Sequence, residues 1–206
     1  MIAAASPLRR TLLIATVSAV LAAAVTAATI LLTQRLTRGP VPPQPAVTIA
    51  VVGDDYSAGR LNRVVWPTLL AQRTGWSVAN FALPGAGFAA DGTGGHAFTW
   101  QVDRALAAKP RAVVLVGGID DGKFLGSDAI RQGAVDALRK VIRSGKRALV
   151  VGPTWFETPV PAEVAAIADQ IRQAADQMRV PYLDALDPPW LTPAQMLADR
   201  SGPNDD

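Results

Sequence analysis

The sequence predicts an α/β domain with a parallel sheet between two layers of helices, preceded by one N-terminal transmembrane helix. Two observations lead to this fold class. Short apolar runs rich in β-branched residues alternate with amphipathic helical stretches from residue 47 onward, as in parallel sheets whose crossovers are helices. Before them, Thr11–Thr33 forms 23 consecutive uncharged residues. Half of the residues are hydrophobic and 18% are charged, which excludes a disordered chain.

The uncharged run is long enough to cross a membrane. As a helix, Thr11–Thr33 would span ~34 Å, against ~30 Å for the hydrocarbon core of a bilayer. Arg9 and Arg10 precede it, and Arg35 and Arg38 follow it. A cleaved signal peptide is the alternative, but its apolar region is shorter, ~7–15 residues. We favour an uncleaved single-pass anchor whose free amino terminus stays inside, so that the domain is extracytoplasmic.

The chain divides into four parts on this basis. Residues 1–10 are an N-terminal flank, 11–33 the transmembrane helix or signal anchor, 34–46 a proline-rich linker, and 47–206 the α/β domain. Four prolines in the seven residues of Gly39–Pro45 favour an extended spacer.

Charge and residue counts exclude several functions. The net charge is +3, but the four arginines before residue 40 leave 16 bases against 17 acids after it. A domain with this balance lacks the clustered basic face of a nucleic-acid-binding protein. The chain has no cysteine, which excludes disulfides and thiolate chemistry, and a single histidine, His96.

Each predicted element follows from its local pattern. Val47–Val52 is rich in β-branched residues and ends at Gly53, as a buried strand would. Asp128–Arg143 has apolar residues at spacings of three and four, and Pro161–Met178 opens with a proline in its first turn. The other predicted strands are Trp76–Phe81, Ala112–Val116, Ala148–Val151 and Val180–Leu183, and the other predicted helices are Asn62–Arg73 and Gln101–Ala108.

We therefore expect a three-layer, flavodoxin-like domain with strand order 2-1-3-4-5. In such sheets the ligand site lies beyond the carboxyl ends of the strands, where the strand order reverses. The loops after Val52, Phe81 and Val116 are the places to look for functional residues.

These three loops carry motifs in a fixed order. The first reads GDDYSAG from Gly53, the second contains Pro84-Gly85-Ala86-Gly87-Phe88, and the third reads Gly118-Ile119-Asp120-Asp121. Together they resemble the blocks of the SGNH (GDSL-type) hydrolase family, over roughly residues 47–206. The resemblance implies an SGNH hydrolase-like fold and hydrolysis of acyl esters without a cofactor.

The resemblance also shows where this chain departs from the family. Asp55 stands at the position of the family's serine nucleophile, and Asp120 at that of its oxyanion-hole asparagine; Gly85 matches the oxyanion-hole glycine. A carboxylate accepts hydrogen bonds and donates none, so it repels a developing oxyanion. The segment Trp190-Leu191 resembles the stretch before the family's final Asp-x-x-His block, but the sequence ends at Asp206 without that histidine, which would also fit a truncated gene fragment.

The functional hypothesis follows from these departures. The catalytic positions are Asp55, Gly85 and Asp120, and the expected substrate-binding residues are Asp54, Ser57, Gly118 and Asp121. We expect a membrane-anchored hydrolase-family domain whose ancestral ester hydrolysis is impaired. The alternative is a pseudoenzyme that binds a ligand or partner, and the candidate ligands are a small acyl ester or an envelope carbohydrate.

Ser57 and His96 are the two residues whose chemistry would suit the missing nucleophile and the missing base. We expect Ser57 to serve at a helix start rather than as a nucleophile, and His96 to be a solvated loop residue rather than a base. After the fourth strand come Trp155 and Phe156, one of which is a candidate to line a pocket.

The four aspartates would meet if the first and third strands are neighbours. Protonation, or a hard cation such as Mg²⁺ or Ca²⁺, would relieve their repulsion. We favour the alternative without a metal, in which Asp54 and Asp121 cap local turns while Asp55 and Asp120 point to solvent.

Overall fold

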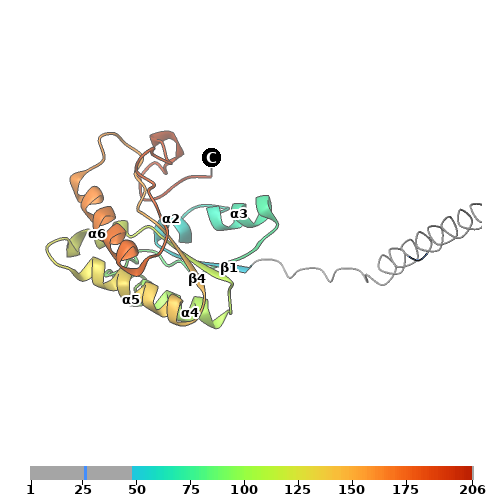
Figure 1. Ribbon diagram of the computed structural model, residues 1–206. Helices are drawn as coiled ribbons and strands as arrows, with labels where there is room; N and C mark the ends of the chain where they lie inside the picture. The colour runs from blue at the N-terminus through green and yellow to red at the C-terminus, as the bar shows by residue number, and fades with distance from the viewer. Residues whose placement is uncertain (1–25, 27–47, 206) are drawn as a thin grey trace, which may run out of the picture. The chain divides into compact units, whose positions relative to one another are not determined.

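A computed structural model describes residue 26 and residues 48–205 (Figure 1). The strands are β1 (Thr48–Gly53), β2 (Ser77–Asn80), β3 (Ala112–Val116), β4 (Arg147–Val151) and β5 (Tyr182–Leu183). The helices are α2 (Asp55–Ala58), α3 (Trp66–Thr74), α4 (Phe98–Ala107), α5 (Ala129–Arg143) and α6 (Ala162–Met178), with 3-10 turns η1 (Ile119–Phe124) and η2 (Pro193–Gln195).

The five strands form one parallel sheet in the order β2-β1-β3-β4-β5, which confirms the predicted order. β1 lies between β2 and β3, with Val51 paired to Asn80 on one side and to Val114 on the other. The carboxyl ends of β1 and β3 are therefore neighbours. This brings the loops that carry the first and third motifs together.

Helices cover the two faces of the sheet unequally (Figure 1). α4, α5 and α6 lie on one face and pack against one another, while α3 lies on the other face against β2. The main core lies under α4–α6. Its largest fully buried side chains include Phe88, Phe98, Leu115, Ile130, Leu138 and Ile171.

The element boundaries differ from the predicted ones in two helices. α3 begins at Trp66 rather than Asn62, because Asn62 instead donates from Nδ2 to the carbonyls of Pro203 (2.7 Å) and Asn204 (3.1 Å). Pro67 then occupies the first turn, where its missing N–H costs nothing. α4 begins three residues earlier than predicted, at Phe98, because this side chain is fully buried and belongs to the core.

The predicted N-terminal flank (1–10), transmembrane helix (11–33) and linker (34–46) lie outside the part of the chain that can be described here, residue 26 excepted. Among the described residues, none of the helices has the length and apolar character needed to cross a bilayer.

One close contact ties the loop after β2 to α5. A Cβ at Gly133, in the middle of α5, would lie 2.0 Å from the carbonyl oxygen of Phe88. Only a glycine leaves room for this backbone approach. The segment of the second motif is thereby held against the helix layer.

We expect Gly133→Ala to lower the free energy of unfolding by about 1–3 kcal/mol, because the methyl group overpacks a backbone contact. Helix propensity alone would favour alanine by about 1 kcal/mol, so the two effects have opposite signs. Urea denaturation measures the difference. Gly126→Ala is the control, since nothing lies within 4 Å of a Cβ there; a Gly133→Ala protein as stable as the wild type would contradict the assignment.

Candidate functional site

Asp54 joins the carboxyl ends of β1 and β3. Its carboxyl group accepts hydrogen bonds from the backbone N–H of Tyr56 (3.1 Å) and Gly118 (2.8 Å), and it is 1% exposed. Burial raises its pKa to about 7, more than these donors lower it, and the charge of Asp120 adds to the rise. A Cβ at Gly117 would lie 1.9 Å from Asp54 Oδ2, so this junction requires glycine. Asp54 caps the short helix α2, as expected, and so serves the scaffold of the site.

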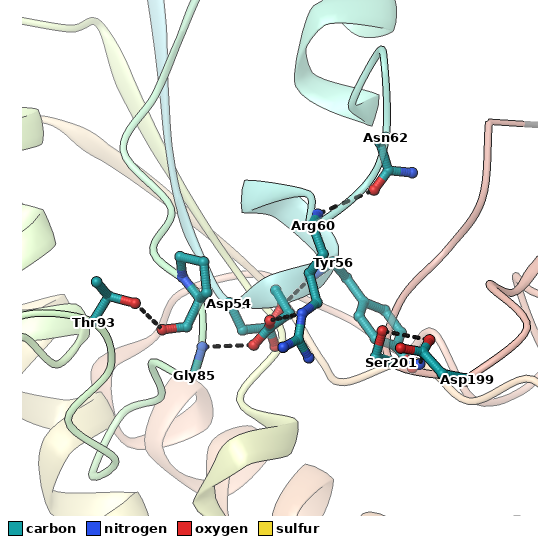
Figure 2. Close-up of polar contacts among 10 residues, drawn as sticks. Asp54, Tyr56, Arg60, Asn62, Gly85, Thr93, Asp199 and Ser201 are labelled. Carbon is teal, nitrogen blue, oxygen red and sulfur yellow. Dashed lines mark hydrogen bonds and ion pairs between the residues drawn. The ribbon is translucent and has the colours of Figure 1, made fainter.

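Asp55 lies at the centre of the site, buried, with its two oxygens held by different groups. Oδ2 accepts the backbone N–H of Gly85 at 2.6 Å, and Oδ1 lies 3.5 Å from Nε of Arg60. The dashed lines that begin at Gly85 and at Arg60 in Figure 2 mark these two contacts. Asp55, at the family's serine position, thus accepts the Gly85 N–H, which the family resemblance assigns to the oxyanion hole. The expectation that Asp55 points to solvent is wrong, because these two partners draw it inward.

Asp120 lies beside Asp55, on η1. It is half-buried, and one of its oxygens has no hydrogen-bond donor within reach in the described residues. Burial, above all, and the neighbouring carboxylates of Asp55 and Asp121 raise its pKa to about 6, while the Arg60 guanidinium acts in the opposite direction. The expectation of a solvent-facing Asp120 is also wrong.

Asp121 organises the second motif. Its carboxylate accepts the backbone N–H groups of Phe88 (2.8 Å), Ala89 (2.9 Å) and Ala90 (2.7 Å). Burial raises its pKa, while these three donors lower it. A Cβ at Gly87 would lie 2.2 Å from Asp121 Oδ1. Asp121 therefore fixes the loop that presents Gly85. The expectation that it caps a local turn is wrong, because its three partners lie 31–33 positions away in the chain.

The remaining expected binding residues have structural contacts. Gly118 has a φ of 103° and gives its N–H to Asp54. Ser57 is fully buried in α2, where its Oγ accepts the indole N–H of Trp66 at 3.0 Å. The predicted place of Ser57 at the start of a helix is thus confirmed.

The single histidine lies against a tryptophan. His96 stacks on Trp100 with the ring centroids 3.6 Å apart. No hydrogen bond joins it to Ser57 or to the carboxylates among the described residues, so the structure supplies no imidazole beside the position of the nucleophile.

Three residues near the site were missed in the sequence. Arg60 contacts Asp55. Hydrogen bonds from Ser201 lower the pKa of Asp199, and the charge of Arg60 lowers it to a smaller extent. Figure 2 shows the hydrogen bond from the Ser201 hydroxyl to Asp199. Asp199 is followed three residues later by Gly202, the spacing of an Asp-x-x-His block with glycine in place of histidine. This spacing is the sequence signal that could have identified Asp199 as a residue near the site. Gln101 was also missed: fully buried in α4, it bonds both the N–H and the carbonyl of Gly53.

No group of three metal-binding side chains with the geometry of a cation site occurs within residues 48–205.

A pocket lies beyond β4. Its volume is about 480 Å³, and it is lined by Phe156, Glu157, Thr158, Pro189, Leu191, Thr192 and Pro193. Phe156 is thus the aromatic residue that lines it, while Trp155 stacks on Phe156 with a centroid distance of 4.7 Å.

The sheet order and the three loops define an α/β domain of the SGNH hydrolase type. A model of the GDSL-like lipase/acylhydrolase family matches residues 48–205, and the chain belongs to this family. Among curated proteins, no match was found.

Solved structures show the same fold. A structure of TesA has a TM-score of 0.62 at 24% identity, covering 76% of this chain and 88% of its own. The SGNH-hydrolase family esterase AlinE4 has a TM-score of 0.61 at 18% identity, covering 76% and 85%. The psychrotrophic esterase EstA from Pseudoalteromonas sp., inhibited by monoethylphosphonate, has a TM-score of 0.55 at 15% identity, covering 77% and 88%.

The raised pKa of Asp54 predicts a pH-dependent stability. The folded state holds the proton up to about pH 7, whereas the unfolded state releases it near 3.8, so its stabilising effect is full at low pH and is lost as the pH rises through 7. Relative to Asp54→Asn, the wild type should lose on the order of 3 kcal/mol of unfolding free energy between pH 5 and 8. Urea denaturation at several pH values measures this. Asp91→Asn, at an exposed carboxyl group, serves as the control. If the free energies of unfolding of the wild type and Asp54→Asn depended on pH in the same way, the raised pKa of Asp54 would be refuted.

The three bonds to Asp121 predict a large effect of its removal. Asp121→Ala should lower the free energy of unfolding by about 3 kcal/mol or more, because three buried N–H groups lose a charged acceptor. Thermal and urea denaturation measure the loss, with Asp91→Ala as the exposed control. A loss below about 1 kcal/mol would mean that the loop finds other acceptors.

Proposed function

We propose that this domain is a non-catalytic member of the GDSL-like hydrolase family, which uses the ancestral cleft to bind a ligand. The observation that carries the proposal is the 2.6 Å hydrogen bond from Gly85 N–H to the Asp55 carboxylate. The residue that should attack a substrate and the donor that should stabilise its oxyanion bind each other instead.

Triad chemistry needs groups that this arrangement does not offer. A serine hydroxyl attacks only when an imidazole accepts its proton and donors stabilise the oxyanion that forms. Asp55 has no proton-bearing hydroxyl for a base to remove. Asp120 adds a second carboxyl group where the family places a donor, and Gly202 adds no side chain at the spacing of the histidine.

A second function is favoured by the raised pKa of Asp120, about 6, to which burial contributes most and the neighbouring Asp55 carboxylate also contributes. A carboxyl pair that shares one proton can hydrolyse an ester without serine. Ionised Asp55 would take a proton from water as its oxygen attacks the ester carbonyl carbon. Asp120 would give its proton to the departing alkoxide, and the proton that Asp55 took from the water would leave the pair with one proton again. This candidate keeps the ancestral reaction with a different nucleophile.

We further propose that residues 11–33 anchor the chain in a membrane and that the domain is extracytoplasmic. The length and lack of charge of this segment support the anchor. An acyl ester or carbohydrate of the cell envelope is then the proposed ligand. Carbonate extraction of membranes from cells that make the full chain tests the anchor: it should stay in the pellet, and release into the supernatant would refute it.

Restoring the three family residues should restore hydrolysis. We expect the full chain, purified in detergent, to leave p-nitrophenyl acetate intact, and the triple variant Asp55→Ser, Asp120→Asn, Gly202→His to hydrolyse it. A side chain fits at position 202, because no heavy atom lies within 4 Å of a Cβ there. The added base alone should contribute about 10²–10⁴-fold.

The matched control replaces Gly202→His by Gly202→Ala in the same background and should stay inactive. Ester hydrolysis by the wild type that is lost in Asp120→Asn would overturn the non-catalytic proposal and support the carboxyl pair. If the triple variant folds but does not hydrolyse p-nitrophenyl acetate, the site no longer aligns a substrate.

A further inference from the structure

Two donors converge on the Asp55 carboxylate from different parts of the chain. The Gly85 N–H comes from the loop after β2 and lies 2.6 Å from Oδ2. The Arg60 guanidinium comes from the segment between α2 and α3, and its Nε lies 3.5 Å from Oδ1. A backbone N–H and a guanidinium, one on each oxygen, are the contacts by which proteins bind a carboxylate.

Arg60 uses only part of its donor set in this contact. Its Nε faces Asp55, while no hydrogen bond from its two terminal nitrogens occurs among the described residues. The side chain is 52% exposed. These nitrogens can therefore pair with a second anion, or with the same anion in two-pronged geometry, from the open side of the cleft.

The segment that carries Arg60 is held in place. The Arg60 N–H donates to Oδ1 of Asn62 at 3.3 Å, and Asn62 in turn binds the carbonyls of Pro203 and Asn204. The Asp205 carboxylate accepts the N–H of the next residue, Arg63, at 2.9 Å. Arg60 is thus presented by an anchored loop, and the site exists before any ligand arrives.

We propose that Gly85 N–H and Arg60 form a carboxylate-binding site that Asp55 fills from within. Asp55 acts as an attached competitor, whose effective concentration far exceeds that of a free anion. The cleft then accepts a carboxylate-bearing ligand when the Asp55 carboxylate leaves the two donors. This inference rests on the proposed binding function and names the chemical class that the cleft recognises.

Two substitutions at position 55 distinguish the effect of emptying the site from the effect of removing the negative charge. Asp55→Ser removes the charge and opens the site, with the residue that the family places there. Asp55→Asn removes the same charge, but its amide oxygen can still accept the Gly85 N–H and so keeps the site filled. Calorimetric titration of the full chain in detergent with sodium acetate, at constant ionic strength, compares the three proteins.

We expect Asp55→Ser to bind acetate at least 10-fold more tightly than the wild type, and Asp55→Asn to bind it no more than about twofold more tightly. Adding Arg60→Ala to Asp55→Ser should abolish the gain. Asp136→Ala on α5 removes one negative charge elsewhere and frees Arg139 from its ion pair, so it measures the nonspecific effect of charge.

Equal gains in Asp55→Ser and Asp55→Asn would overturn the proposal, because charge alone would then explain them. The proposal would also be overturned if the gain in acetate affinity persisted after Arg60→Ala, or if a folded Asp55→Ser protein showed no gain. Thermal melts establish folding before each titration. Ester hydrolysis by the wild type would refute the non-catalytic function, whereas the acetate titrations report on the carboxylate site alone, so the two failures are distinguishable.

Discussion

The bond between the Asp54 carboxyl group and the Gly118 N–H is the contact on which the geometry of the cleft depends. It spans 64 positions in sequence and locks the end of β1 to the end of β3. The residues on either side of it, Asp55 and Asp120, owe their closeness to this junction. The site therefore has a fixed shape whether or not its chemistry is intact. Gly117 contributes by leaving room for the carboxyl oxygen.

Several contacts around the site belong to its scaffold. Asp121 and its three backbone donors, Gln101 and its two bonds to Gly53, and the Gly133 approach all serve to place loops rather than to react. Such contacts are selected for folding as well as for catalysis, because each leaves buried polar groups or voids when removed. A family fold can outlast its ancestral reaction for this reason.

Sequence patterns predicted the sheet order and most elements, because buried strands and amphipathic helices leave strong periodic signals. They also placed Asp54 at the cap of a local turn. They failed for Asp121, whose partners lie 31–33 positions away, and for Asp55, which is oriented by the Gly85 N–H 30 positions away and by Arg60. They failed for Asp120 too, which lies half-buried. No local pattern encodes such contacts. The start of α3 was misjudged for the same reason, since the partners of Asn62 lie more than 140 positions away.

Those partners give the folding of the cleft an order in time. The segment between α2 and α3 acquires its fixed position only through Asn62 and Arg63, whose acceptors are residues 203–205. Residues 203–205 follow all five strands and α4–α6 in the chain, so they are synthesised after them. The sheet and these helices can therefore be complete while Asn62 and Arg63 still lack their acceptors.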